Sequence, residues 1–415
     1  MLQKYLQRTI QHGHLRVQIG QGPVQVFGDG TGPEISVQLT PAAAVKLAFN
    51  PDLKLGESFM DGELTFEAGD MYGLLELAAR NNKVWRRDDG FISRLRRSAL
   101  RQLTQINGRQ ASRRNVAHHY DLSHDLYRRF LDSDLQYSCA YFRTSGDTLE
   151  EAQVAKKAHI AAKLGIRPGD KVLDIGCGWG GLGLTLGGLG AEVLGITLSQ
   201  EQLAVARQRA AASGLDRHVD FQLCDYRDVR GQFDRIVSVG MFEHVGIPNY
   251  QAYFDTVARL LSDDGVALVH SIGRRTPPGI TQPFIAKYIF PGGYIPALSE
   301  VLPAIERAGL WVTDVEILRL HYAETLREWR RRFETQRAEI AALYDERFCR
   351  MWEFYLVSSE AGFRFFGMMN FQIQLTRKVD ALPFTRDYMA ASERDMLAAE
   401  AHLHAPSAAQ RTAAE

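Results

Sequence analysis

The sequence has 415 residues, 45% of them hydrophobic and 24% charged, and its 49 Lys and Arg are balanced by 49 Asp and Glu. This length predicts two domains of ordinary globular composition. A net charge of zero gives no overall field for nucleic acid, and no apolar stretch has the length of a membrane span or the pattern of a signal peptide. Four cysteines without paired spacing favour a reducing, cytoplasmic compartment.

The first part of the chain predicts a small α+β unit. Alternating apolar residues indicate strands at 15–19, 24–26 and 35–39. A helix is expected over 41–48, and the glycine-containing segment 53–66 suggests irregular structure. Asp70 is a typical N-cap, so we expect a further helix from there to Arg80.

A basic segment follows this unit. Between Arg80 and Arg114 there are eleven Lys or Arg against two Asp, and residues 86–105 predict a partly amphipathic helix. Such a segment suits an anionic membrane surface, with an attraction of about 1 kcal/mol per basic residue. A solvated helix face has the same composition.

Three closely spaced histidines, His118, His119 and His124, raise the question of a metal site. No cysteine or acidic cluster completes a set of ligands. Helix-surface or capping roles are therefore favoured, and no metal site is predicted.

A glycine-rich turn follows an apolar strand within residues 172–181, where Gly176, Gly178 and Gly180 occupy alternate positions. Glycines leave room for a ligand to lie against the main chain. The spacing is tighter than the G-x-G-x-x-G of dinucleotide sites, which favours a single nucleoside, with S-adenosylmethionine as the leading candidate. A simple tight connection between strand and helix would have the same composition.

Residues 171–273 alternate strand and helix patterns, as in a doubly wound parallel sheet. The C-terminal ends of such strands meet at one edge, where ligands bind. Polar residues follow these ends, namely Thr197 with Gln202, Asp225 with Tyr226, Glu243 with His244, and His270. Together they predict one ligand crevice, although each alone is equally typical of a helix cap.

The rest of the chain is less regular. Residues 276–293 are too apolar for a solvated loop and are expected to pack over another part of the protein. We place the next elements as a helix at 299–308, a strand at 311–320 and a charged helix at 324–344. Residues 351–374 are rich in Phe and Met, which is typical of core packing or of a lipid-lined cavity. The alanine-rich end of the chain predicts disorder.

Several motifs together resemble the cyclopropane-fatty-acyl-phospholipid synthase family, whose members use S-adenosylmethionine to modify unsaturated lipid acyl chains. They are His119–Leu122, Tyr137–Phe142, Val172–Gly181, Thr197–Ser199 with Gln202, Met241–Gly246, Phe290–Gly293 and His321–Tyr322. The similarity runs from about His118 to Met389 and is weaker before it.

The resemblance implies an α/β fold, with a class I methyltransferase Rossmann-like sheet, helices on both faces and a small α+β N-terminal domain. The expected division is an N-terminal lipid- or membrane-binding domain at 1–106, a linker at 107–117, a catalytic domain at 118–390 and a disordered tail at 391–415. It also implies a cytoplasmic protein on the inner face of the membrane, no nucleic-acid partner, and is compatible with a homodimer.

The resemblance also implies site residues. The cofactor S-adenosylmethionine would be surrounded by Tyr137, Ser138, Gly176, Gly178, Gly180, Thr197, Gln202, Asp225 and Tyr226. The catalytic residues would be Cys139, Glu243, His270 and Tyr322, which with the backbone of Ile272 would hold a bicarbonate ion. Taken singly, Cys139 is equally typical of a small buried apolar residue, Glu243 of a cofactor ligand and Tyr322 of a core residue.

The implied activity is cyclopropane fatty acid synthesis, in which the methyl group of the cofactor is transferred to the cis double bond of a phospholipid acyl chain. Three other interpretations remain open. The enzyme would produce methyl-branched or methylene chains, or would methylate a small molecule on the same fold, or the protein would be a membrane-surface module that senses S-adenosylmethionine.

Overall fold

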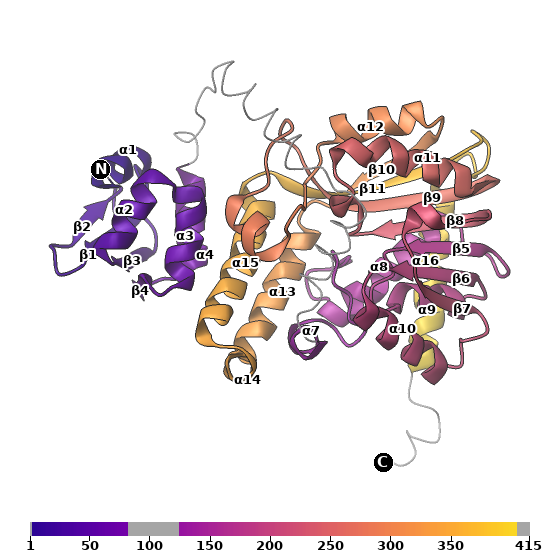
Figure 1. Cartoon of the computed structure of the whole chain (residues 1–415), viewed down its shortest axis with the longest axis horizontal. Coiled ribbons are helices and arrows are strands. Elements are labelled where there is room, and N and C mark those ends of the chain that lie inside the picture. The colour runs from indigo at the N-terminus through magenta and orange to yellow at the C-terminus, as the bar shows by residue number, and fades with distance from the viewer. Residues whose placement is uncertain (1, 82–123, 405–415) are drawn as a thin grey trace, which may run out of the picture.

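The computed structural model describes residues 2–81 and 124–404, which form an N-terminal unit and a larger unit built on a seven-stranded sheet (Figure 1). The predicted basic helix at 86–105, the linker at 107–117, and His118 and His119 lie outside the described residues. The boundary between the two domains therefore stays a prediction.

The N-terminal unit packs its helices on a four-stranded sheet of order β2-β1-β3-β4. Its elements are α1 (Leu2–Thr9), β1 (His14–Ile19), β2 (Gln25–Phe27), β3 (Glu34–Leu39), α2 (Pro41–Phe49), α3 (Pro51–Met60), β4 (Leu64–Ala68) and α4 (Met71–Arg80). The predicted strands and the helix at 41–48 are confirmed to within one residue. Asp70 caps α4 as predicted, because it accepts a hydrogen bond from the N–H of Gly73 at 2.7 Å.

The irregular structure predicted for residues 53–66 is wrong, since α3 and β4 occupy this segment. The side chain of Asn50 caps α3 and Pro51 lies in its first turn, a combination that favours helix initiation. Gly56 misled the prediction because a glycine in a helix interior is usually unfavourable. Glycine occupies this position because of a tertiary contact, since the rings of Phe284 and Phe354 lie against it.

The larger unit is built on a mixed sheet of order β10-β11-β9-β8-β5-β6-β7. Its strands are β5 (Lys171–Ile175), β6 (Glu192–Thr197), β7 (Val219–Leu223), β8 (Phe233–Val239), β9 (Leu261–Arg274), β10 (Trp311–Ile317) and β11 (Met368–Thr376). Strands β5 to β9 run parallel and confirm the five predicted strands. The sequence interpretation missed β11, which lies antiparallel between β9 and β10 and makes the sheet mixed.

Helices cover both faces of this sheet (Figure 1). They are α7 (His124–Phe130), α8 (Leu149–Leu164), α9 (Gly181–Gly188), α10 (Gln200–Ala212), α11 (Tyr250–Leu260), α12 (Leu298–Arg307), α13 (His321–Thr335), α14 (Arg337–Leu343), α15 (Glu346–Phe365) and α16 (Asp387–His404). The single helix predicted at 324–344 is wrong in its bounds, because α13 begins at His321 and is interrupted at Gln336. Tyr322 therefore lies in the first turn of a helix.

Residues 391–404 are helical where the sequence predicted disorder, and the rest of the predicted tail, 405–415, lies outside the described residues. Helix α16 lies along α8, and His159 of α8 joins it to the sheet. The His159 ring is hydrogen-bonded through Nδ1 to Glu393 at 2.9 Å and through Nε2 to Glu316 on β10 at 2.8 Å. The prediction failed because these partners come from elements distant in sequence.

This contact predicts a pH-dependent stability. Burial lowers the pKa of His159, but the bonds to Glu316 and Glu393 outweigh burial and raise the pKa above its usual 6.5. A raised pKa in the folded state stabilises the fold below pH 6.5, and this contribution is lost as the pH rises through the folded value. We expect His159→Gln to lower the free energy of unfolding by about 1–3 kcal/mol at pH 6 and by less at pH 9, as measured by urea unfolding. Equal losses at both pH values would contradict a charged His159.

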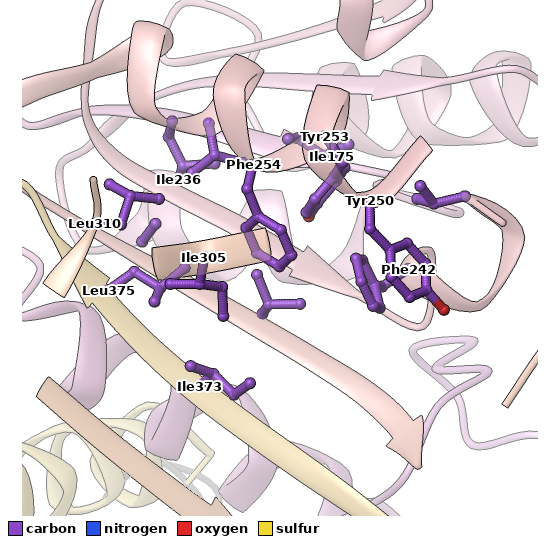
Figure 2. Packing of buried hydrophobic residues seen from close by; sticks show 14 of the residues in the cluster. Ile175, Ile236, Phe242, Tyr250, Tyr253, Phe254, Ile305, Leu310, Ile373 and Leu375 are labelled. Carbon is purple, nitrogen blue, oxygen red and sulfur yellow. The ribbon is translucent and has the colours of Figure 1, made fainter. Parts of the chain in front are cut away.

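A buried apolar core joins the sheet to α11 and α12. Figure 2 shows the rings of Phe242 and Tyr250 side by side, with Phe254 nearer to Ile305. The rings of Phe242 and Tyr250 are stacked with centroids 4.5 Å apart. Since Phe242 immediately precedes Glu243, this packing fixes the short turn that carries the predicted catalytic carboxylate.

The N-terminal unit contacts the larger unit through α15 and the segment 276–293 (Figure 1). Phe284 and Phe354 belong to the same buried cluster as the N-terminal core, and their ring centroids are 4.6 Å apart. Glu57 on α3 accepts a hydrogen bond from the hydroxyl of Tyr288 at 2.8 Å. The predicted packing of segment 276–293 over another part of the chain is thus confirmed.

Candidate active site

A tight turn links β5 to α9 near the middle of the sheet. Gly176, Gly178 and Gly180 adopt φ angles of +83°, +56° and +84°, a region that other residues rarely adopt. The N–H groups of Gly176 and Cys177 donate to the carbonyl of Ile196 on β6 at 2.9 and 3.0 Å. The turn is therefore fixed to the neighbouring strand.

This turn forms one wall of a cavity at the edge of the sheet, which we call the glycine-turn cavity. Eight of the nine residues predicted to surround the cofactor line it, namely Tyr137, Ser138, Gly176, Gly178, Thr197, Gln202, Asp225 and Tyr226. The ninth, Gly180, is not part of its lining. A Cβ atom at Gly180 would lie 2.7 Å from the ring of Phe221 and 3.0 Å from Ala206, so this glycine allows close packing of α9, α10 and β7.

Polar side chains from neighbouring strands hold one another in the glycine-turn cavity. The hydroxyl of Thr197 donates to Gln202 Oε1 at 2.9 Å. Asp225 accepts from Arg227 through both carboxylate oxygens, at 2.8 and 2.6 Å. Burial raises the pKa of Tyr226 to about 12, so its ring stays neutral. An aromatic ring beside fixed hydroxyl and amide groups suits a nucleoside.

A second cavity, which we call the apolar cavity, adjoins the first. Tyr137, Ser138, Gly240 and His244 line both. The apolar cavity brings together all five residues predicted for the active site, namely Cys139, Glu243, His270, Ile272 and Tyr322. Much of its remaining wall is aromatic or contains sulfur, as in Phe290, Tyr294, Tyr355, Phe363, Phe366 and Met368.

Glu243 is a buried carboxyl group with one oxygen unengaged. Its Oε1 accepts a hydrogen bond from the N–H of Ile272 at 2.6 Å, whereas Oε2 has no hydrogen-bond partner among the described residues. Burial raises the pKa of Glu243 to about 7. The N–H of Ile272 therefore orients Glu243, and a backbone contact from Ile272 to an ion stays a prediction.

His270 is a neutral ring held from both sides. Its Nε2 and Nδ1 lie 3.2 Å from the side-chain amides of Asn370 and Gln372 on β11. Burial, with smaller contributions from nearby cations, lowers the pKa of His270 to about 3. A neutral imidazole has one donor and one acceptor, so one of the two amides must present its oxygen to the ring.

Cys139 and Tyr322 are packed into the aromatic wall. Cys139 is buried, and burial raises the pKa of its thiol, which excludes a reactive thiolate at neutral pH. The ring of Tyr322 lies 4.8 Å from that of Phe363. The hydroxyl of Tyr137 lies 2.7 Å from that of Tyr355, at the boundary between the two cavities.

The structure adds residues that sequence reasoning missed. Lys156 and Asp174 line the glycine-turn cavity, and Asn370 and Gln372 hold His270. Only Asp174 had a signal in the sequence, since it is a charged residue that interrupts the apolar run 172–175. The others required knowledge of which elements meet.

Two general features complete the description of the site. Within residues 2–81 and 124–404, no group of three His, Cys, Asp or Glu side chains has an arrangement that could hold a metal ion. In the same ranges, none of the helices has both the length and the apolar character needed to span a bilayer.

Comparison with known proteins gives related enzymes. The family described as mycolic acid cyclopropane synthetase matches residues 107–373. The cyclopropane-fatty-acyl-phospholipid synthase of Escherichia coli (strain K12) is 40% identical over 330 residues, 79% of this chain and 84% of that protein. A probable fatty acid methyltransferase of Pseudomonas putida is 37% identical over 393 residues, 91% of this chain and 96% of that protein.

A solved structure adds a match of fold and sequence. The mycolic acid cyclopropane synthase CmaA1, crystallised in complex with SAH and CTAB, is 36% identical with a TM-score of 0.61, covering 63% of this chain and 97% of that one. The family match spans more than half of the chain, and the Escherichia coli relative aligns over most of both proteins. The chain therefore belongs to the cyclopropane synthase family of S-adenosylmethionine-dependent methyltransferases.

Proposed function

We propose that this protein is a cyclopropane fatty acid synthase, which transfers the methyl group of S-adenosylmethionine to the cis double bond of phospholipid acyl chains. The observation that carries the proposal is the junction between the two cavities. Residues suited to a nucleoside line one side, aromatic and apolar side chains line the other, and Glu243 lies at the apolar side with an unengaged oxygen.

The proposed reaction explains why such a site is needed. An isolated alkene is a weak nucleophile, but a sulfonium methyl group is a strong electrophile. A new bond forms between the methyl carbon and one alkene carbon as the bond from sulfur to methyl breaks, which leaves a cation on the chain. Loss of a proton from the new methyl group then allows its electron pair to close the three-membered ring. The products are S-adenosylhomocysteine, a proton and a cyclopropane.

The protein must protect this cation from water and stabilise it. The rings of Phe290, Tyr355 and Phe363 line the apolar cavity, where aromatic faces attract positive charge. The hydroxyls of Tyr137 and Tyr355 bond to each other, which occupies polar groups that would otherwise hold water. Glu243 supplies negative charge in a site with little competing solvent.

Bicarbonate fits the groups around Glu243 in part. The Cys139 thiol is an uncharged donor, and Oε2 of Glu243 is buried without a partner among the described residues, so these two groups and Tyr322 would hold the ion. Bound there, bicarbonate supplies a general base. The ring nitrogens of His270 are already bonded to Asn370 and Gln372, so His270 would shape the site without a direct hydrogen bond to the ion.

A second product class has support from one comparison. The Pseudomonas putida relative is named as a fatty acid methyltransferase rather than a cyclopropane synthase. The same cation, quenched differently, would give a methyl-branched or methylene chain.

Product analysis distinguishes these outcomes. We expect purified protein, incubated with S-adenosylmethionine and liposomes of cis-unsaturated phospholipid, to add one CH₂ to the acyl chain and remove its double bond. Gas chromatography with mass spectrometry of the released chains measures both changes. A product that keeps a double bond or is reduced would indicate the branched-chain activity, and methylation of a small amine but never of lipid would contradict both lipid activities.

We also propose that the protein is cytoplasmic and docks on the anionic inner face of the membrane through its N-terminal unit. Val45 and Phe49 lie one turn apart on α2 and are 59% and 74% exposed, which leaves apolar surface for a lipid contact. The basic segment 80–114 would add electrostatic attraction.

Liposome co-sedimentation tests this docking. Charge reversal of Arg94, Arg96 and Arg97 is expected to weaken binding to anionic vesicles about tenfold or more, since each contact contributes about 1 kcal/mol. Phe49→Ser is expected to weaken binding to neutral and anionic vesicles alike. Unchanged sedimentation of both variants would show that the N-terminal unit does not take part in membrane binding.

A further inference from the structure

The segment 136–142 carries residues of both cavities but belongs to no helix or strand. Tyr137 and Ser138 line both cavities, and Cys139 lines the apolar one. Because the segment has no neighbouring strand, its backbone groups need other partners, and buried N–H and C=O groups are costly to leave unpaired. Side chains of α8 and α13 supply such partners.

One end of the segment is held by α8. The side-chain amide of Gln153, which is 1% exposed, donates to the carbonyls of Gln136 and Ser138 at 3.3 and 3.1 Å. Gln136 and Ser138 both line the glycine-turn cavity. Gln153 therefore holds the part of the segment that faces the proposed cofactor.

The other end is held by the first turns of α13, the helix that carries Tyr322. The N–H of Ala140 donates to Thr325 Oγ1 at 3.0 Å. The N–H of Phe142 donates to His321 Nδ1, also at 3.0 Å. The two acceptors are four residues apart and share one face of the helix, so α13 takes the place of a neighbouring strand.

The two acceptors are themselves fixed. Thr325 is fully buried, and its hydroxyl donates to the carbonyl of His321 at 2.8 Å, which leaves its lone pairs for Ala140. The His321 ring stacks on that of Tyr141 with centroids 4.8 Å apart. Burial lowers the pKa of His321, so its ring stays neutral and Nδ1 can accept a hydrogen bond.

We infer that Thr325 and His321 are positioning residues for the reaction, because they fix the Cys139 end of the segment to the helical turn that carries Tyr322. Cys139 and Tyr322 both line the apolar cavity, where reacting groups need to be placed to within a fraction of an ångström. The expected effect on turnover rests on the proposed function. The competing explanation is that these hydrogen bonds contribute to stability alone.

Variants of Thr325 separate the two explanations. Thr325→Val has nearly the same shape but offers no acceptor to Ala140. We expect it to lower kcat on cis-unsaturated liposomes about ten- to a hundredfold, because a misplacement of about 1 Å can have an effect of that size. Calorimetric binding of S-adenosylhomocysteine is expected to weaken less than about twofold, since Gln153 still holds the other end of the segment. Thr325→Ser keeps the hydroxyl and is expected to restore most of kcat.

Thr256→Val is the matched control. Thr256 on α11 also donates to the carbonyl four residues before it, that of Ala252 at 2.8 Å, but it lines neither cavity. Its replacement is expected to lower stability to urea without lowering kcat. The inference is overturned if folded Thr325→Val has the kcat of Thr256→Val, or if Thr325→Ser is as slow as Thr325→Val.

Hydrogen exchange, followed by mass spectrometry, gives an answer that does not require turnover. We expect Thr325→Val to speed exchange in peptides covering residues 137–142 at least about tenfold, because a buried hydrogen bond is lost, and Thr256→Val to leave it unchanged. Unchanged exchange in folded Thr325→Val overturns the inference.

A second variant covers the case in which Thr325→Val does not fold. His321→Phe keeps a ring beside Tyr141 but has no acceptor for the N–H of Phe142, and it is expected to speed exchange and lower kcat in the same way. Exchange and kcat equal to those of the wild type overturn the inference. If the wild-type protein makes no lipid product, the proposed function fails, and the exchange rates still show whether Thr325 and His321 hold the segment.

Discussion

Glu243→Gln is expected to reduce turnover at least about a hundredfold while folding and cofactor binding persist. Glutamine has nearly the same shape, and its carbonyl oxygen can still accept the hydrogen bond that Ile272 gives to Oε1 at 2.6 Å. What the variant loses is the negative charge beside the proposed cation and the ability to exchange a proton. Product formation from S-adenosylmethionine and cis-unsaturated liposomes measures the loss, and calorimetric binding of S-adenosylhomocysteine shows that the cofactor cavity is intact.

The pH dependence of activity shows which protonation state of Glu243 acts in the reaction. The pKa of this group is raised to about 7 by burial, so the ionised fraction rises from about a tenth at pH 6 to about nine tenths at pH 8. If the carboxylate form acts, wild-type activity at a fixed bicarbonate concentration rises over this interval, and the residual activity of Glu243→Gln does not. Activity that falls as the pH rises would instead mean that protonated Glu243 acts as a hydrogen-bond donor.

Glu353→Gln is the matched control for this prediction. Glu353 on α15 also has its pKa raised by burial, but it pairs with Arg337 and does not line either cavity. Its replacement is expected to leave the pH profile of activity unchanged. A comparable loss of turnover in both variants would mean that Glu243 acts through stability and not through the chemistry.

The central part of the fold was predictable because its signals are local. The strands β5 to β9 contain apolar residues and alternate with helix patterns, and the turn after β5 is marked by Gly176 and Gly178, whose positive φ angles require glycine. The residues at the strand ends meet because parallel strands have a fixed direction. The placement of Thr197, Asp225, Glu243 and His270 around two adjoining cavities follows from that topology.

The parts that sequence reasoning missed depend on contacts between distant segments. Strand β11 alternates too little to be recognised, because both faces of it are buried and its polar residues Asn370 and Gln372 serve His270. Helix α16 has little apolar surface of its own and is held by Glu393 on His159. Lys156 looks like any lysine of a charged helix until the fold turns it toward the cavity. In each case the structure of the segment depends on residues distant in sequence that contact it, and the segment's own sequence does not reveal these contacts.

Gly56→Ala is expected to destabilise the protein, although alanine normally stabilises a helix interior by about 1 kcal/mol relative to glycine. A Cβ atom at this position of α3 would lie 2.4 Å from a ring carbon of Phe284 and 2.6 Å from one of Phe354. Both rings are buried and pack on each other, so neither can move without disturbing the core. Overpacking of this kind costs about 1–3 kcal/mol, measurable by urea unfolding.

The same substitution is expected to lower activity on phospholipid, because the displaced rings adjoin the apolar cavity, which is the proposed acyl site. Phe284 lies between Pro283 and Ile285, which line the apolar cavity, and the next turn bonds to Glu57 of the N-terminal unit through Tyr288. Gly188→Ala is the matched control, since an added Cβ at the end of α9 would meet no atom within 4 Å. If Gly56→Ala lowers activity while S-adenosylhomocysteine binding stays unchanged, α3 helps to shape the acyl site and not the cofactor site. Stability and activity equal to those of Gly188→Ala would instead show that Phe284 and Phe354 can move aside without loss of stability. The N-terminal unit would then contribute to membrane binding and not to the shape of the cavity.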